Sequence, residues 1–236
     1  YQYVIAKERN EFTEQALVRL SQVFLKQSNW ADVTPILTRL ETEADFPQNI
    51  VFAQSNLMKA NFQLEQYPNA VIYARKMLEN PKIEDLIKND AQVIIARSAI
   101  KTGNNAQAKE TYAEVQKTAT GSLAAEALYY DAYFTNAASN YELSNTKIQE
   151  LTKSYSGHKY YAAKGLVLMA KNFYELEDAY QATYILEKVI ENFSMYDDVV
   201  TEAQTELQRI KLEESKRNSS IDIIPTENDT QYEEGN

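Results

Sequence analysis

The only histidine of the chain, His158, is the first residue to test for catalysis. It lies in a short stretch, 156–159, between two helical segments. A catalytic triad centred on it would need a shaped pocket, which loops between stacked helices rarely supply. Because the chain has no cysteine and no second histidine, it cannot assemble a His/Cys metal site. We therefore expect His158 to be a solvated or helix-capping residue, with no metal and no cofactor bound.

Paired carboxylates occur at Asp197–Asp198 and Glu213–Glu214, and they could in principle do acid–base work. Both pairs fall near expected helix ends in solvated segments, and Asp197–Asp198 suits the positive end of a helix dipole. A calcium loop would need a spaced D-x-D-x-D-G run, which is absent. Glycine-rich phosphate loops and an H-E-x-x-H motif are absent as well. The sequence predicts no catalytic residue, and we expect the protein not to be an enzyme.

Tyrosine is the residue type most able to support recognition, since the chain contains 17. The aromatic residues are densest at 129–134 and at 160–161. We expect Tyr130, Phe134 and Tyr160 to pack between neighbouring helices.

A repeat of about 37 residues organises the whole chain. Its anchor is a turn that recurs at Trp30, Tyr67, Asn105, Tyr141 and Ala179, so the steps are 37, 38, 36 and 38 residues. Each unit is predicted to contain a first helix, a tight turn and a second helix, because apolar residues recur three and four positions apart. The expected helix pairs are 12–27 with 30–43, 50–65 with 67–79, 86–102 with 105–118, 122–138 with 140–153, and 160–176 with 178–192. Pro35 fits this pattern if its helix begins near Asp32, which can cap it.

Segments before and after the repeats complete the predicted organisation. Residues 1–8 resemble the end of a preceding repeat, so we expect the natural protein to continue upstream of Tyr1. Residues 196–217 form an amphipathic segment that would cap the last repeat. From residue 218 onward the composition is that of a disordered acidic tail. Within that tail, Ile221, Ile223 and Ile224 are apolar enough to dock onto the repeats or onto a partner.

Composition favours an all-α protein. Glycine and proline number only 5 each, which leaves little material for the turns of a β fold. The net charge of -10 argues against a nucleic-acid partner. No run of about 18 apolar residues occurs, so the segment should not insert into a membrane.

The repeats resemble the tetratricopeptide repeat (TPR) family. That family places small residues at positions 8 and 20 of a repeat, and the fifth unit matches with Ala170 and Ala182, followed by Leu186 and Val189. In the second unit the resemblance puts Lys59 at position 8. It implies an all-α solenoid of about five helical hairpins, with repeats at about 12–46, 49–82, 84–120, 121–157 and 158–195. The long, Tyr- and Asn-rich units also resemble bacterial envelope proteins such as BamD and YbgF/CpoB, and repeat proteins of Bacteroidota.

The resemblance implies a non-catalytic scaffold that binds a protein or peptide in a concave groove. Groove positions of the family fall on Gln22, Leu25, Asn56, Arg97, Tyr129, Tyr133, Asn136, Lys164, Lys171 and Tyr174. In that family, repeats that bind the acidic C-terminus of heat-shock chaperones carry Lys at position 5 and Asn at position 9. In the second unit these positions fall on Asn56 and Ala60, and no unit carries that pair. The expected location is the bacterial periplasm or outer membrane, with the cytoplasm as the alternative. The alternative function is a glycan- or peptidoglycan-binding module, in which Tyr and Trp rings would stack on sugars.

Overall fold

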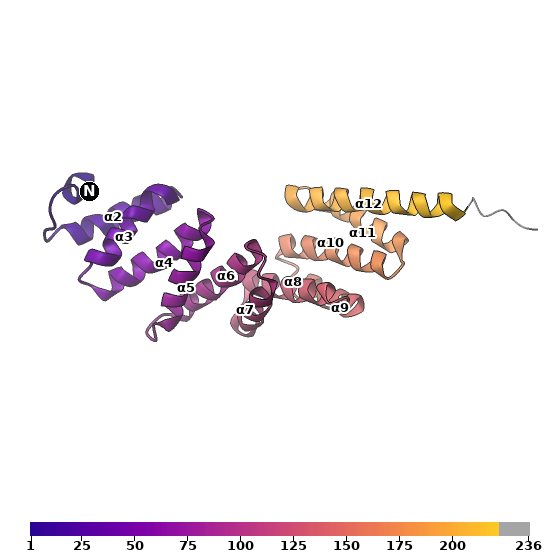
Figure 1. Cartoon of the computed structure of the whole chain (residues 1–236), viewed down its shortest axis with the longest axis horizontal. Coiled ribbons are helices and arrows are strands. Elements are labelled where there is room, and N and C mark those ends of the chain that lie inside the picture. The colour runs from indigo at the N-terminus through magenta and orange to yellow at the C-terminus, as the bar shows by residue number, and fades with distance from the viewer. Residues whose placement is uncertain (222–236) are drawn as a thin grey trace, which may run out of the picture. The chain divides into compact units, whose positions relative to one another are not determined.

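The computed structural model of the chain describes residues 1–221 and confirms an all-α fold, with no strand among those residues. Consecutive helices pack against each other along the chain (Figure 1). The helices are α1 (Gln2–Ile5), α2 (Thr13–Lys26), α3 (Trp30–Glu43), α4 (Pro47–Gln63), α5 (Tyr67–Glu79), α6 (Asp85–Lys101), α7 (Asn105–Thr118), α8 (Gly121–Ala137), α9 (Tyr141–Ser154), α10 (Lys159–Glu175), α11 (Ala179–Asn192) and α12 (Asp197–Ile221).

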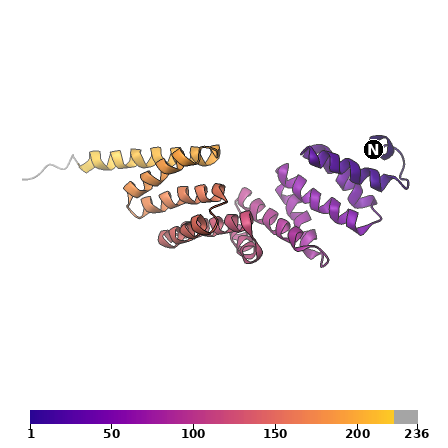
Figure 2. The ribbon, with the colours of Figure 1, turned by 180° about the vertical axis from the view of Figure 1, so that it is seen from behind.

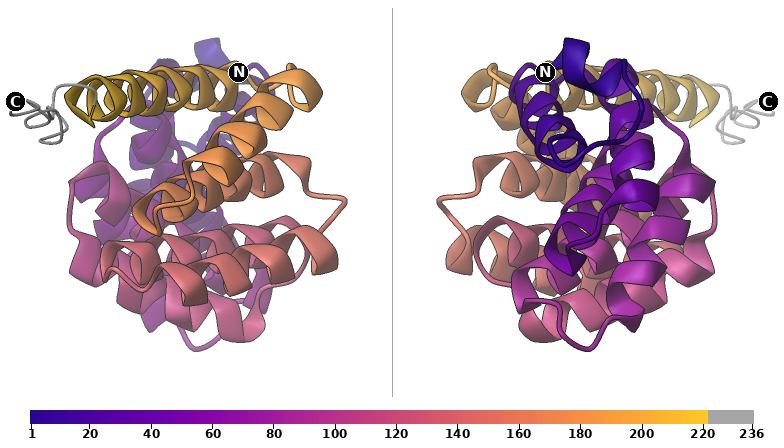
Figure 3. Two further views of the ribbon diagram at one scale, coloured as in Figure 1. Left: turned by 90° about the vertical axis from the view of Figure 1, so that its right-hand side faces the viewer. Right: turned by 90° about the vertical axis from the view of Figure 1, so that its left-hand side faces the viewer.

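The chain divides into two compact units, and each is described by itself. Unit 1 is Tyr1–Asp131, and unit 2 begins at Ala132, so the boundary lies inside α8. Unit 1 begins with the short helix α1, which a loop joins to α2 (Figure 3, right). The single array expected over residues 1–217 therefore stays a prediction.

Each helix pair is joined by the same backbone turn. A single residue with positive φ ends the first helix, and an Asn, Gln or Asp follows it as the N-cap of the second helix. The residues with positive φ are Ser28, Glu65, Gly103, Ser139 and Glu177. Their spacing repeats the steps read from the sequence, and a left-handed residue is a common way to end a helix. The cap side chains of Asn29, Asn104 and Asp178 each accept a hydrogen bond from the backbone N–H three residues later.

The first of these turns corrects the expected cap of α3. Asn29, and not Asp32, is the N-cap, and its side chain accepts a hydrogen bond from the backbone N–H of Asp32. Pro35 consequently lies inside α3, beyond the first turn where proline is best tolerated.

Counting back from the turns also corrects the register of the second unit. Seven residues before each positive-φ residue lies a fully buried side chain: Ser21, Met58, Ala96, Ala132 and Ala170. Met58, and not Lys59, therefore occupies the small-residue position in α4. The pair compared above with the chaperone clamp shifts from Asn56 and Ala60 to Ser55 and Lys59, and Ala60 is fully buried.

A second row of small residues explains how closely the helices pack. Twelve residues before each positive-φ residue the chain has alanine or glycine, all of them buried: Ala16, Ala53, Ala91, Ala127 and Gly165. At Gly165 an added Cβ would lie 3.1 Å from the side chains of both Ile148 and Leu151 of α9. Ala203 of α12 continues the row 38 residues after Gly165 and is also fully buried.

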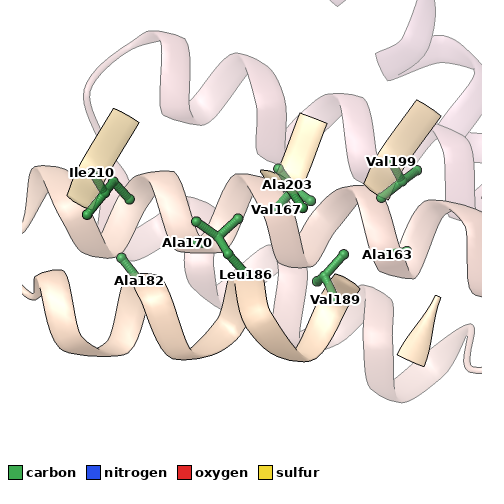
Figure 4. Packing of buried hydrophobic residues seen from close by; sticks show 9 residues of the cluster. All are labelled: Ala163, Val167, Ala170, Ala182, Leu186, Val189, Val199, Ala203 and Ile210. Carbon is green, nitrogen blue, oxygen red and sulfur yellow. The ribbon is translucent and has the colours of Figure 1, made fainter. Parts of the chain in front are cut away.

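Helix α12 occupies the place of a sixth first helix, and it does not turn where the others do. It continues through Ser215, 38 residues after Glu177, and ends at Ile221, past the expected end at residue 217 (Figures 1 and 2). The left panel of Figure 3 shows it as one uninterrupted helix. It packs on α10 and α11 through a shared apolar core: Ala163, Val167, Ala170, Ala182, Leu186, Val189, Val199, Ala203 and Ile210 (Figure 4).

The opposite side of α12 is exposed and mostly polar. Thr201, Thr205 and Gln208 lie there, together with Leu212, which is 57% exposed. A helix with one apolar and one mostly polar side can terminate a stack of repeats, because it offers little further apolar surface. Of the proposed docking residues, Ile221 ends α12, and Ile223 and Ile224 lie outside the described residues, so tail docking stays a prediction.

Candidate functional site

Each unit has candidate binding residues on the first helices of its pairs, on α4 and α6 in unit 1 and, separately, on α10 in unit 2. Two positions on these helices recur. One lies six residues before the positive-φ turn and carries Gln22, Lys59, Arg97, Tyr133 and Lys171. The other lies thirteen residues before the turn and carries Gln15, Phe52, Asp90, Glu126 and Lys164. We call the side formed by these positions the inner face.

Along the inner face, basic side chains of one first helix form ion pairs with acidic side chains of the first helix of the following pair. Lys59 Nζ lies 2.6 Å from Asp90 Oδ2, and Lys171 Nζ lies 2.6 Å from Glu202 Oε1. Arg97 donates from Nε and Nη2 to the two oxygens of Glu126, at 2.7 and 2.5 Å. In the two pairs of unit 1, the base lies six residues before its turn and the acid lies thirteen residues before the turn of the next first helix. Glu202 holds the corresponding place in α12, thirteen residues before Ser215. Ion pairs therefore connect neighbouring first helices along the inner face of each unit.

Glu126 is the most buried member of these bridges. Its residue is 1% exposed, whereas the Arg97 side chain is 39% exposed. The Tyr112 hydroxyl also donates to Glu126 Oε1, at 2.7 Å, and the Tyr112 ring stacks on Tyr130 with centroids 4.3 Å apart. A buried carboxylate is tolerated when several donors surround it, and Arg97 and Tyr112 supply these donors to Glu126.

In unit 2, side chains of α12 engage two of the expected groove residues, Lys171 and Tyr174. The Tyr174 hydroxyl donates to Glu213, at 2.9 Å, and to Glu214, at 3.2 Å. The Arg209 guanidinium lies over the Tyr174 ring, 4.9 Å from its centroid. Burial and the hydrogen bond to Glu213 raise the pKa of Tyr174 to about 12. Lys171 and Tyr174 thus bind the last helix.

Asn136, another expected groove residue, belongs to a buried amide network in unit 2. Its Nδ2 donates to Asn172 Oδ1 at 2.6 Å, and Asn172 Nδ2 donates in turn to Ser144 Oγ and Asn145 Oδ1. Asn172 is fully buried, so these bonds satisfy an amide that would otherwise destabilise the fold.

The remaining expected groove residues differ in exposure. Gln22 is exposed and accepts a hydrogen bond from Arg19, whereas Leu25 packs against the core of unit 1. Asn56 donates to Phe52 O of its own helix. Tyr129 is only 7% exposed. Tyr133 is half-buried with its ring edge-on to Phe134, and Lys164 lies 5.8 Å from the Tyr160 ring centroid.

A cavity of about 220 Å³ opens on the inner face of unit 1. Its apolar walls come from Trp30, Phe62, Val93, Ile94 and Leu123, and its polar rim comes from Lys59, Gln63, Asp90 and Arg97. The structure thus gathers Arg97 with Lys59, Trp30 and Phe62, which the sequence did not place in the groove. Lys59 was missed because of the one-residue register error, and the recurring base-to-acid spacing would have found it.

A second hollow, of about 520 Å³, lies nearer the start of unit 1. Gln22 lines it together with Val18, Arg19 and Phe46. It is bordered by Glu14, whose carboxylate accepts hydrogen bonds from the backbone N–H groups of Asp45 and Phe46 at the start of α4. Glu14 is therefore occupied in capping a helix.

His158 is the N-cap residue of α10, and its side chain makes no capping hydrogen bond. Its ring lies 6.5 Å from that of Tyr155. Within residues 1–221 no group of three or more His, Asp or Glu side chains could hold a metal ion. None of the described helices is both long and apolar enough to cross a membrane.

Comparison with solved structures identifies the class of fold. The chain is similar to a tetratricopeptide repeat protein from Parabacteroides merdae, with a TM-score of 0.65 and 16% sequence identity over 92% of this chain and 81% of that one. A thermophilic TPR protein of Thermus thermophilus matches with a TM-score of 0.47 and 12% identity, over 83% of this chain and 99% of that one. No family model and no curated protein matches the sequence. The chain therefore has a TPR-type fold, which leaves its partner open.

Proposed function

We propose that the protein is a non-catalytic scaffold that binds a protein or peptide partner on the inner face of unit 1. The observation that carries the proposal is the cavity beside Lys59, Asp90 and Arg97. A preformed hollow with apolar walls and a polar rim suits a partner's side chain. Stacked helical repeats commonly present such surfaces to other proteins.

A pull-down with matched variants tests this proposal. The bait would be the chain itself, with Gln63→Arg as the inner-face variant, because Gln63 is exposed at the cavity rim. Ile72→Arg is the control, because Ile72 is 54% exposed on α5 and lies away from this cavity. We expect a partner from an extract of the source organism to bind the wild type and the control but not Gln63→Arg. Equal retention by all three baits, or no specific partner, would contradict the proposal.

We also infer that this scaffold works in a bacterial cell envelope, in the periplasm or at the outer membrane. What supports this is the resemblance of the long, Tyr- and Asn-rich repeats to envelope proteins of the BamD and YbgF/CpoB type, and to repeat proteins of Bacteroidota. Fractionating cells of the source organism and probing each fraction with an antibody to the chain tests it. Recovery only in the cytoplasmic fraction would overturn the envelope assignment and leave the scaffold proposal standing.

The glycan-binding alternative gains no specific support. It relied on Tyr and Trp rings that could stack on sugars. Tyr129, Tyr130 and Tyr160 have their rings packed against other aromatic rings, and Trp30 packs against the core of unit 1. Tyr160 also donates its hydroxyl to Asp198. These contacts therefore favour the scaffold over the glycan-binding module.

A further inference from the structure

We infer that the cavity between α4, α6 and α8 receives an uncharged apolar side chain from an extended segment of the partner. This inference rests on the proposed scaffold function and specifies the chemistry of its ligand.

The walls are apolar. Phe62 contributes from α4, Val93 and Ile94 from α6, and Leu123 from the start of α8. Phe62 and Leu123 are half-buried, so part of their surface remains in water. Burying such surface under a ligand is favourable by about 25 cal/mol per Å². A volume of about 220 Å³ is enough for one large aliphatic or aromatic side chain and too small for a folded element.

The charges at the rim are already balanced. Lys59 pairs with Asp90, and Arg97 makes two hydrogen bonds to the buried Glu126. Two bases therefore face two acids. A ligand carboxylate would have to compete with Asp90 or Glu126 for its partner, and a ligand ammonium would have to compete with Lys59 or Arg97. An uncharged side chain enters without breaking either pair, so charge complementarity selects an apolar anchor.

The polar rim has a different role from the walls. Gln63 is exposed beside the opening and can both donate and accept hydrogen bonds. These are the bonds that the backbone of an extended segment requires on either side of its anchor residue. The binding mode we propose is thus one buried apolar side chain with its flanking peptide groups held at the rim.

The chain carries its own reporter for this event. Trp30 is the only tryptophan of the protein, and it lines the cavity. Its fluorescence should change when the cavity fills. The signal therefore reports on this cavity.

The test begins with a displayed library of random heptapeptides selected on the full chain. We expect the selected peptides to share one Leu, Ile, Met or Phe at a fixed position without an obligatory acidic neighbour. A synthetic copy should change Trp30 emission on binding. Replacing its anchor by Ala should weaken binding by about 10-fold or more, since a buried aliphatic side chain is lost. Added salt should have little effect, because exposed charge pairs dominate salt-dependent binding.

A pair of leucine variants locates the site. Leu123→Glu places a charge in the apolar wall and should weaken peptide binding by about 10-fold or more. Leu86→Glu is the matched control, because Leu86 also lies in the first turn of a first helix, α6, but is 69% exposed and outside the cavity. It should leave binding unchanged. If Leu123→Glu does not fold, Gln63→Arg, at an exposed rim position, replaces it as the blocking variant.

The outcomes separate this inference from the proposed function. Selected peptides that bind equally well to both leucine variants, or that depend on an acidic residue and on low salt, overturn the apolar anchor and leave the scaffold intact. Failure to select any peptide overturns the anchor and counts against the scaffold as well.

Discussion

At the scale of single residues, the most consequential side chain is Glu126. It is buried, it accepts from Arg97 and Tyr112, and it ties α8 to α6 and α7. Loss of this carboxylate would affect Arg97 and Tyr112 differently. Arg97 is partly exposed and can turn to water, whereas the Tyr112 residue is only 2% exposed and would keep a buried hydroxyl with a poorer partner.

We therefore expect Glu126→Gln to lower the free energy of unfolding by about 1–3 kcal/mol. The matched control is Glu114→Gln, which breaks the exposed pair with Lys117, where both side chains are more than half exposed. It should change stability by less than about 0.5 kcal/mol. Urea unfolding followed by circular dichroism measures both. Equal effects of the two substitutions would contradict the structural role of Glu126.

Tyr73 should make the stability of the protein depend on pH. Burial, together with its hydrogen bond to Glu41, raises the pKa of Tyr73 to about 12. Burial also favours the neutral form of Glu41, but hydrogen bonds from Lys76, Gln54 and Tyr73 outweigh it and lower the pKa of Glu41. In the unfolded chain the tyrosine pKa is about 10. The folded state therefore holds the phenol proton more tightly than the unfolded state.

The sign of the effect follows from this difference. The stabilisation is complete below about pH 10 and is lost as the pH rises toward 12, because the unfolded chain releases the proton first. We expect the fall in stability above pH 10 to be shallower in Tyr73→Phe than in the wild type. Tyr180→Phe is the control, because Tyr180 is 78% exposed and should keep the wild-type slope. Urea unfolding at several pH values gives the slopes, and identical slopes for all three proteins would refute the linkage.

At the scale of the helices, the interfaces depend on small residues. Ala170 of α10 and Ala182 of α11 are both fully buried in the shared core with α12. Neither position has space for three more carbon atoms without displacing Leu186 or its neighbours.

Ala170→Leu and Ala182→Leu should each cost about 1–3 kcal/mol, because the extra volume forces the helices apart. Ala106→Leu is the control, since Ala106 is exposed near the start of α7, and it should stay within about 0.5 kcal/mol of the wild type. Thermal unfolding compares them. Unchanged melting temperatures for both buried variants would mean that these helices do not meet as described.

The helices and their turns could be predicted from the sequence more fully than the interfaces between helices. The turns were found from sequence because a local signal marks each of them, such as Asn29, Gly103 or Asp178. The register of α4 was missed by one residue. Lys59 lies only 11 residues before Ala70, whereas the two small-residue positions of the fifth unit, Ala170 and Ala182, are 12 apart, as Met58 and Ala70 are. Local periodicity fixes a helix face only to within such a step.

The candidate site was less predictable than the fold. A groove position names the residue but does not say what faces it from the next helix. Arg97 and Lys171 were expected to meet a partner, yet they bind Glu126 and Glu202 of the same chain. The bridge depends on the offset between neighbouring helices, and that offset is set by the closely packed small residues such as Ala127 and Gly165. The sequence shows the basic and the acidic positions of each helix, but it does not show the distance between those side chains on neighbouring helices.

At the scale of the whole molecule, the question is how the stack of helices ends. Helix α12 repeats the buried small residue and the inner-face acid of a sixth first helix, at Ala203 and Glu202. It lacks the turn and shows a mostly polar outer side at Thr205 and Gln208. From these features we predict that α12 caps the stack. They also make it separable, because it contacts the other helices only through one side.

Removing α12 is the decisive test of that role. A chain ending at Met195 would lose Val199, Ala203 and Ile210 and would expose the apolar surface of α10 and α11 around Val167 and Val189. A patch of this kind promotes self-association, so we expect aggregation or a broad, weakly cooperative unfolding transition. A chain ending at Ile221 keeps the whole of α12 and should remain as stable as the full protein, which controls for the loss of the last residues. Light scattering coupled to gel filtration, with thermal unfolding, distinguishes the two truncations. A shorter chain that stays monomeric and melts at the wild-type temperature would show that α12 is not needed to end the stack.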